Sequence, residues 1–294
     1  MRGYIFNDNN HCWAYSYFPY PDVVYNRIPT REDESQSITQ ACLKNFGSHN
    51  IPFFNVGFLD KWEMYECLLG DPELRVFLPE TRLLTRYSLQ AALEKWGTVY
   101  LKPRAGQKGE GIQTASVKEN GAIWHRTYGE NHEFTSFIKM WDAVGPDFAG
   151  IPYLIQPQIL LDRHKGRAYD FRLIVQKTAG EWRLTGAGAR LAAENAITTH
   201  VPRGGELLAL TAIHPPPDLA LLTKLVTNGA MRLESQFSPL AELSFDIGRD
   251  VAGQYWLFEA NAKPMEFDET EIETKRMLRL IDIFYEKSGF EKHT

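Results

Sequence analysis

The spacing of apolar and polar residues predicts both strands and a helix in the first 57 residues. "PDVVYNRI" predicts a strand around 23–28, and "PFFNV" predicts a second strand. Between them, "TREDESQSITQACLKNFGSHNI" predicts one helix, with Thr30 as its N-cap and Gly47 at its end. These elements are too few for a complete doubly wound domain, so residues 1–57 are expected to form a short α/β segment that packs on the rest.

The next part of the chain contains both helix and strand patterns. Asp60 is placed to cap a helix over "KWEMYECLL", and "LPETRLL" predicts a strand. A helix is expected from Ser88, as its cap, to Gly97, and "TVYLKP", "IQTASVK" and "AIWHRTY" predict three more strands. "EFTSFIKMWDAV" predicts a helix that stops at Gly145.

From Tyr153 onward, strand patterns dominate. "YLIQPQIL" predicts a strand bent at Pro157, "YDFRLIVQKTAGEWRLTGAGARLA" predicts a hairpin, and "AELSFDIGRD" with "QYWLFEAN" predicts a second hairpin. "DLALLTKLVTNGAMRLESQF" and "ETEIETKRMLRLIDIFYEKSGF" predict amphipathic helices. Because strands and helices do not alternate regularly, the pattern favours an α+β fold over a Rossmann-type sheet.

Composition narrows the class of protein. The 294 residues are 44% hydrophobic and 23% charged, as in ordinary globular proteins, and the formal net charge of -5 argues against a nucleic-acid surface. The first residues contain no continuous apolar core of a signal peptide, and no run of about 18 apolar residues occurs. We therefore expect a cytoplasmic protein without nucleic-acid or membrane partners. The three cysteines form no CxxC pair, so reduced thiols are expected rather than zinc ligands or disulfides.

A glycine-rich stretch, "VYLKPRAGQKGEGI", carries the first candidate chemistry. Lys102 ends a predicted strand, and Gly106, Gly109 and Gly111 follow within nine residues. Glycines let backbone N–H groups turn toward one point, which is how such loops bind phosphate. Walker and Rossmann loops lead into a helix, whereas "IQTASV" is strand-like, and the kinase lysine follows its glycines rather than preceding them. Two alternatives remain: a flap over a triphosphate, or a hairpin with a solvated lysine.

A second group of polar residues lies in the last predicted hairpin. Glu259 and Asn261 are two residues apart and therefore share one strand face, and Asp246 can lie opposite them on the preceding strand. Apolar residues occupy both faces of this hairpin, so carboxylates there need a cation or a basic partner. Two carboxylates and an amide oxygen form a suitable site for a hard cation such as Mg²⁺.

Arginines form a third group. Asp170 and Arg172 share a strand face, Arg190 lies on the return strand, and Arg203 precedes a Gly-Gly turn in "THVPRGGE". Guanidinium groups directed into a pocket suit the bidentate recognition of phosphate or carboxylate. The alternatives are a local Asp170–Arg172 ion pair and a loop charge at Arg203.

The ordered set of motifs resembles the ATP-grasp superfamily, and most closely its YheC/YheD-like group, named for endospore coat-associated proteins. The resemblance covers roughly residues 55–285. It is carried, in sequence order, by "DKW", "LPET", "YLKPRAGQKGEGI", "YLIQPQI", "YDFRLIV", "GAGARLA", "RGGE", "FDIG" and "FEANAKP". The resemblance implies two α+β subdomains that grip ATP, so we expect a short N-terminal segment (1–57) and an ATP-grasp domain (58–294) with a lid at about 80–152.

The resemblance also implies roles for individual residues. Lys102 would contact the ATP phosphates, Lys61 would be a second lysine near the nucleotide, and Asp170 would lie beside it. The flap would run from Gly106 through Gln107 and Gly109 to Gly111, and the adenine would face the hinge strand at Gln156, Gln158 and Ile159. Asp246, Glu259 and Asn261 would hold two Mg²⁺ ions, or Mn²⁺ in their place. Arg172, Arg190 and Arg203 would lie toward the acyl phosphate and the substrate.

The implied activity is ATP-dependent ligation of an unidentified carboxylate to an amine or thiol through an acyl phosphate. Two alternatives remain at this stage: a nucleotide-binding structural or regulatory component associated with the spore coat, and an ATP-grasp kinase that phosphorylates a small molecule. Arg27 is a candidate for recognition of a substrate carboxylate. Relatives with this fold often dimerise, so a homodimer is one candidate assembly.

Overall fold

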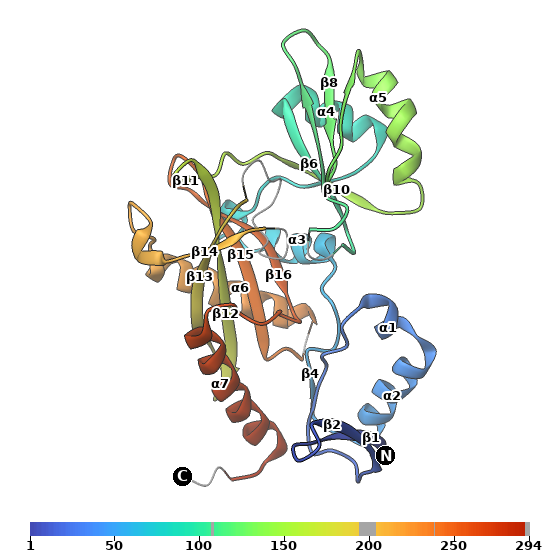
Figure 1. Cartoon of the computed structure of the whole chain (residues 1–294), viewed down its shortest axis with the longest axis vertical. Helices are drawn as coiled ribbons and strands as arrows, with labels where there is room; N and C mark the ends of the chain where they lie inside the picture. The colour runs from blue at the N-terminus through green and yellow to red at the C-terminus, as the bar shows by residue number, and fades with distance from the viewer. Residues whose placement is uncertain (107–108, 194–203, 238, 292–294) are drawn as a thin grey trace.

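The computed structural model describes residues 1–106, 109–193, 204–237 and 239–291 (Figure 1). Its strands are β1 (Arg2–Asn7), β2 (Cys12–Tyr17), β3 (Val24–Tyr25), β4 (Phe53–Phe54), β5 (Arg82–Leu83), β6 (Thr98–Pro103), β7 (Gln113–Val117), β8 (Ile123–Arg126), β9 (Asn131–Phe134), β10 (Tyr153–Pro157), β11 (Arg163–His164), β12 (Arg167–Thr178), β13 (Glu181–Leu191), β14 (Glu206–Leu208), β15 (Glu242–Arg249) and β16 (Tyr255–Asn261). Its α-helices are α1 (Arg31–Ser35), α2 (Ser37–Ser48), α3 (Lys61–Leu69), α4 (Arg86–Trp96), α5 (Phe137–Val144), α6 (Leu219–Phe237) and α7 (Thr270–Ser288).

The first sheet has the strand order β5-β10-β6-β7-β8-β9, and every pairing in it is antiparallel. Helices α4 and α5 cover one of its faces, in the upper part of Figure 1. Val99 and Leu101 of β6 point into this core and are fully buried. Since side chains alternate along a strand, Tyr100 and Lys102 point to the opposite face.

The second sheet has the order β14-β13-β12-β15-β16, again with antiparallel pairs throughout. Phe171 of β12 and Phe245 of β15 are fully buried in the largest core, together with apolar residues of α3 and α6. The alternating positions, including Asp170 and Asp246, therefore point to the other face. The antiparallel sheets confirm the predicted α+β class.

The N-terminal segment packs on the second sheet and on α7 through a small core around Phe54. Asn55, which is fully buried with φ 55°, fastens this junction. Its amide donates to the carbonyl of Glu242 at 2.7 Å and its oxygen accepts from the N–H of Ala241 at 2.9 Å. The N-terminal segment thus stabilises the start of β15, which lies almost 190 positions further along the chain.

Several predicted boundaries in the N-terminal segment were wrong. The expected strand around 23–28 is only two residues long, β3, and pairs in parallel with β4. Thr30 caps a helix as predicted, but that helix divides at Gln36, whose extended ψ of 139° separates α1 from α2. The antiparallel hairpin β1–β2 was not predicted at all.

Two helix starts also differ from the sequence prediction. The residue that caps α4 is Thr85, and Ser88 completes a capping box three residues later, because both hydroxyls satisfy free N–H groups of the first turn. Helix α5 begins after Ser136 rather than at residue 133, because Asn131–Phe134 instead form the edge strand β9. Asp60 caps α3 as predicted.

Among the described residues, none of the helices has the length and apolar character needed to cross a membrane.

Candidate nucleotide site

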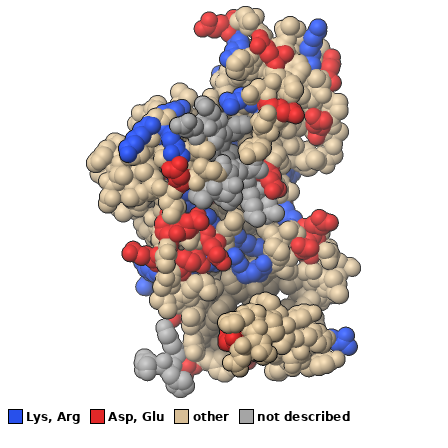
Figure 2. All heavy atoms as spheres, in the orientation of Figure 1, with Lys and Arg blue, Asp and Glu red and all other residues tan. Residues whose placement is uncertain are grey.

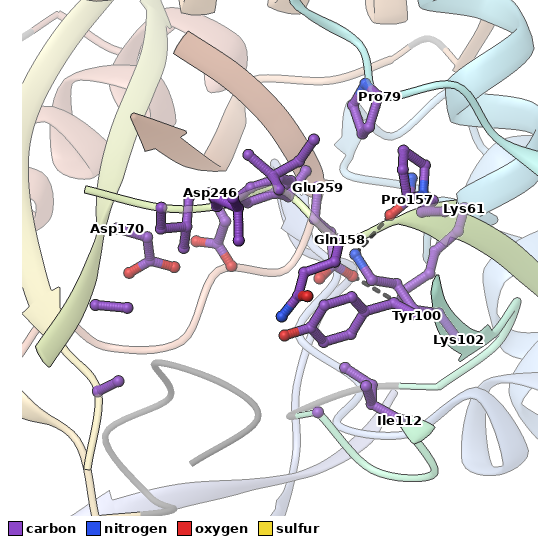
Figure 3. A pocket seen from close by; sticks show the side chains of 18 of the residues that line it. Lys61, Pro79, Tyr100, Lys102, Ile112, Pro157, Gln158, Asp170, Asp246 and Glu259 are labelled. Carbon is purple, nitrogen blue, oxygen red and sulfur yellow. Dashed lines mark hydrogen bonds and ion pairs between the residues drawn. The ribbon is translucent and has the colours of Figure 1, made fainter. Parts of the chain in front are cut away.

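The inner faces of the two sheets meet around one pocket of about 440 Å³, a volume typical of small-molecule sites. Figure 3 shows Asp170 and Asp246 on one side of it, Lys61, Lys102 and Tyr100 on the other, and Glu259 between them. Ten residues predicted for the site line this pocket: Lys61, Lys102, Gly106, Gly109, Gln156, Gln158, Ile159, Asp170, Asp246 and Glu259. Residues up to about 200 positions apart in the sequence therefore converge on one pocket.

Lys102 lies at the centre of the pocket wall formed by β6 and β10. Its ammonium group donates to Oε1 of Gln156 at 2.6 Å, and the Gln156 amide in turn donates to Thr81 at 2.9 Å. Burial lowers the pKa of Lys102 to about 8, and the carboxylates of Glu259 and Asp246 only partly offset this effect. The lysine is therefore held in the pocket wall by Gln156 and is not a fully solvated charge.

The glycine-rich loop joins β6 to β7, so it leads into a strand and not a helix. Gly111 has a φ of +69°, and a Cβ added there would lie 2.8 Å from Cγ of Pro103. Lys61 donates to the carbonyl of Gly106 and forms an ion pair with Glu259 at 2.7 Å. This lysine thus connects the loop to the second sheet across the pocket.

The predicted carboxylate pair is assembled by strand register. Asp246 of β15 lies directly opposite Glu259 of β16, as expected from the sequence. The register shifts immediately afterwards, because Ile247 pairs with Leu257 and leaves Phe258 as an extra residue. This bulge brings both Phe258 and Glu259 to the pocket wall.

Arg190 balances the charge of the two carboxylates on the second sheet. Its guanidinium group binds Asp170 through two bonds of 3.0 and 2.6 Å and contacts Asp246 at 3.1 Å. Burial alone would lower the pKa of Arg190, but the two carboxylates outweigh burial and raise it. The ion pair of Asp170 is with Arg190 and not with Arg172, the alternative considered from the sequence, because Arg190 faces Asp170 in the β12–β13 register.

Not every predicted site residue lines the pocket. In the part of the chain that the structure describes, Gly111, Arg172, Arg190 and Asn261 lie outside its lining. Arg172 instead donates to the carbonyl of Met265 at 2.9 Å. Gln107 and Arg203 lie outside the described residues.

Sequence reasoning missed two aromatic residues of the pocket wall, Tyr100 and Phe258. The Lys102 ammonium group lies 5.8 Å from the ring centre of Tyr100 and 5.4 Å from that of Phe258. Tyr100 was within reach of sequence analysis, because it precedes Lys102 by two residues on the same strand face. Phe258 reaches the pocket only through the bulge, for which the sequence carries no evident signal.

The donors at the Asp246–Glu259 end fit a hard divalent cation. Two carboxylates from paired strands face one cavity, and Asn261 follows on the face of Glu259. Within the described residues, no group of three or more His, Cys, Asp and Glu side chains could hold a metal by itself.

Two antiparallel α+β layers around such a pocket define the ATP-grasp fold. Solved ATP-grasp proteins share it: the ligase PsnB bound to a minimal precursor has a TM-score of 0.58 at 12% identity, covering 97% of this chain and 86% of that one. D-alanyl-alanine synthetase A from Vibrio cholerae has a TM-score of 0.57 at 13% identity, covering 97% and 81%. At these identities the likeness concerns the fold alone.

The chain belongs to the YheC/D-like ATP-grasp family, whose model matches residues 50–286. Endospore coat-associated protein YheD of Bacillus subtilis is 29% identical over 279 residues, and YheC of the same organism is 22% identical over 283. Both alignments cover 90% of this chain, but it spans only 61% of the length of YheD and 76% of that of YheC.

Proposed function

We propose that this protein is an ATP-dependent ligase that activates a carboxylate as an acyl phosphate and transfers the acyl group to an amine or a thiol. The observation that carries the proposal is the convergence of Lys102, the glycine loop and the Asp246–Glu259 pair on one pocket between two sheets. Similar solved structures support it, since they include an N5-carboxyaminoimidazole synthase in complex with ADP.

The pocket walls suit a nucleotide with its phosphates toward the second sheet. Tyr100, Gln156 and Ile159 offer an apolar surface with amide donors and acceptors for a base, while Lys61 and Lys102 supply positive charge for the phosphates. Gly106 and Gly109 have no side chain, so phosphate oxygens could approach the backbone closely at these positions. Both glycines line the pocket next to the two lysines.

Asp246 and Glu259 would hold Mg²⁺, with Asn261 as a further oxygen ligand. When bound, the ion supplies charge neutralisation for the transferring phosphoryl group. Lys61 would exchange its bond to Glu259 for a phosphate oxygen, and Arg190 would keep Asp170 and Asp246 oriented.

The chemistry has two steps. A carboxylate oxygen of the acid attacks the γ-phosphorus, the bond from this phosphorus to the β,γ-bridging oxygen breaks, and ADP leaves. The nucleophile then attacks the carbonyl carbon of the acyl phosphate, phosphate leaves, and the nucleophile loses its proton. Positioning and charge neutralisation suffice for phosphoryl transfer, so no nucleophilic side chain is required.

Trapping with hydroxylamine tests the proposal. Purified protein is incubated with MgATP, hydroxylamine and single acids from a panel, and both ADP and hydroxamate are measured. The expected result is hydroxamate in proportion to ADP for at least one acid, lost in the Glu259→Ala variant. Stable phosphorylated product without hydroxamate would instead identify a kinase, and MgATP binding without turnover of any acid would favour a nucleotide-binding role in the spore coat.

A further inference from the structure

A group of arginines beyond the Asp246–Glu259 end of the pocket has no part in the nucleotide site. Arg27 comes from the N-terminal segment, Arg31 from α1, and Arg172 from β12. Figure 2 shows Lys and Arg side chains gathered near the middle of one face of the molecule, beside a group of acidic side chains. Arg172 is distant in sequence from Arg27 and Arg31, so its position near them is a property of the fold.

Their positions are fixed by main-chain carbonyls in two short segments. Arg27 donates to the carbonyl of Pro264, and Arg172 donates to the carbonyl of the next residue, Met265, at 2.9 Å. Arg27 and Arg172 therefore bind consecutive residues of one short segment. Both are attached to the segment that directly follows β16, the strand of Glu259.

Arg31 joins the same group from the other side. It donates to the carbonyl of Leu59, and its guanidinium carbon lies 5.0 Å from the ring centre of Phe58. The ammonium group of Lys263 lies 4.1 Å from the same ring. Lys263 itself is neutralised, because it forms a buried ion pair with Glu34.

The charges of the three arginines are not neutralised by ion pairs. Among the residues that the structure describes, none of the three lies within ion-pair distance of a carboxylate, and Arg31 and Arg172 each donate to a single main-chain carbonyl. Burial lowers the pKa of both Arg31 and Arg172, although nearby carboxylates partly offset this effect. A guanidinium group has five N–H donors in a planar fork, so most of these donors remain available to an anion.

One of the three arginines, Arg172, lies beside the end of the pocket where phosphoryl transfer is proposed. Arg172 lies directly opposite Asp246 in the β12–β15 register, on the same sheet face. Such cross-strand partners have Cβ atoms about 4.5–5.5 Å apart. A molecule bound to the arginines would therefore extend directly to the carboxylates where phosphoryl transfer is proposed.

We propose that Arg27, Arg31 and Arg172 form a binding site for an anionic group of the acid substrate, so that the substrate carries a second carboxylate or a phosphate besides the carboxylate that is activated. This inference rests on the proposed function, because it names the class of acid. The second anion would be held by guanidinium forks, and the reacting carboxylate would face Asp246 and Glu259.

The first test probes the anion site without knowledge of the substrate. Unfolding temperatures are measured in low-millimolar sulfate and in chloride of equal ionic strength, with the pocket filled by the nonhydrolysable analogue MgAMPPNP. Sulfate is expected to raise the unfolding temperature of the wild type by about 2–4 °C more than that of Arg27→Gln or Arg172→Gln. Arg183→Gln, which alters an exposed arginine paired with Glu181, is the matched control and should behave as the wild type. Sulfate also stabilises proteins in general, but this effect is the same in all variants and therefore cancels when their shifts in unfolding temperature are compared.

The second test compares matched acids in the ADP-release assay. Glutarate, aspartate, glutamate and 3-phosphoglycerate are set against butyrate, asparagine, glutamine and glycerate. At least one acid that carries the second anionic group is expected to release ADP at a KM tenfold or more below that of its counterpart without this group. In Arg27→Gln this KM should rise about tenfold with little change in kcat, since the arginine binds substrate away from the reacting bond.

Three results would overturn the inference. The first is equal sulfate stabilisation of the wild type and both variants. The second is an equal KM for every acid and its counterpart without the second anionic group. The third is an unchanged KM in Arg27→Gln. If the nucleotide did not bind at all, the proposed function would fail, but the sulfate comparison in the nucleotide-free protein would still decide whether the arginines bind an anion.

Discussion

At the level of single residues, burial in the pocket wall disfavours the charged form of Lys102. Its folded-state pKa of about 8 lies below the ordinary value of 10.5, so the unfolded chain binds more protons between these limits. Stability should therefore rise with pH from about 8 to 10.5, as far as this group contributes. Burial favours the neutral form of Lys102, whereas nearby nucleotide phosphates would favour the charged ammonium form and so raise its pKa.

ATP binding should consequently be coupled to protonation of Lys102. We expect MgATP binding to take up nearly one proton at about pH 9 and almost none at about pH 7. Calorimetric titrations in two buffers with different ionisation enthalpies measure this uptake. Lys102→Met should bind MgATP at least tenfold more weakly and take up no proton, whereas Lys95→Met, at an exposed site, should not differ from wild type. Equal proton uptake in all three proteins would contradict the assignment of Lys102.

Gly248 shows how a residue outside the pocket shapes its wall. A Cβ added at this position would lie 2.5 Å from Leu161 and 2.5 Å from the ring of Phe258, and both of these residues line the pocket. Gly248→Ala should therefore displace the Phe258 ring, lower the free energy of unfolding by about 1–3 kcal/mol and weaken MgATP binding severalfold.

The matched control for this substitution is Gly47→Ala in α2. An added Cβ meets no atom within 4 Å there, so alanine should preserve or slightly increase stability because it favours helix. Urea unfolding and calorimetry measure the two effects. If Gly248→Ala behaved like Gly47→Ala, the packing argument for Phe258 would fail.

At the scale of secondary-structure elements, a buried network attaches α7 to the second sheet. Glu242, at the start of β15, is fully buried and accepts from Arg276 of α7 at 2.8 and 3.0 Å and from Gln176 at 2.7 Å. Tyr25 of β3 donates to the same carboxylate at 2.5 Å. Three parts of the chain thus meet at the strand that carries Asp246.

Removing the guanidinium group of Arg276 from this network should lower the stability of the protein. Arg276→Met leaves the buried Glu242 carboxylate without its charged partner, so the free energy of unfolding should fall by about 3–5 kcal/mol. Lys224→Met breaks an ion pair with Glu73 in which both side chains are 64% exposed, and should cost less than about 1 kcal/mol. Denaturant unfolding of the two variants provides the comparison, and similar losses would show that α7 is held by other contacts.

Element patterns in the sequence predicted some features well because local rules determine them. The alternation of β15 and β16 placed Asp246 opposite Glu259, and Asp60 capped α3 as expected. The hairpin β1–β2 was missed although "NDNN" is a strong turn signal. Its aromatic residues are largely exposed, for example Trp13 at 68% and Tyr17 at 71%, so they do not mark a buried face.

Other features depend on contacts between distant segments and leave no local signal. The break at Gln36 interrupts an otherwise continuous helix pattern. The bridge from Lys61 to Gly106 and Glu259 exists only because α3 lies between the two sheets. The pairing of Arg190 with Asp170 depends on the register of β12 and β13, which the sequence does not specify.

For the whole molecule, a few polar contacts connect the two sheets around the pocket. Arg104, which follows β6, forms a bidentate bond with Asp60 at 2.8 and 3.1 Å, next to the bridge made by Lys61. A ligand in the pocket would touch both sheets, so binding MgATP should stabilise the molecule as one unit.

Calorimetric titration with ATP, in the presence and absence of Mg²⁺, is the decisive measurement. Magnesium-dependent binding is expected in the wild type and in Glu181→Ala, an exposed control, with at least tenfold weaker binding in Glu259→Ala, or about 1.4 kcal/mol. ATP binding that was independent of Mg²⁺, or equal in Glu259→Ala and wild type, would contradict the proposed site. Absence of binding under every condition would contradict the nucleotide-dependent function altogether.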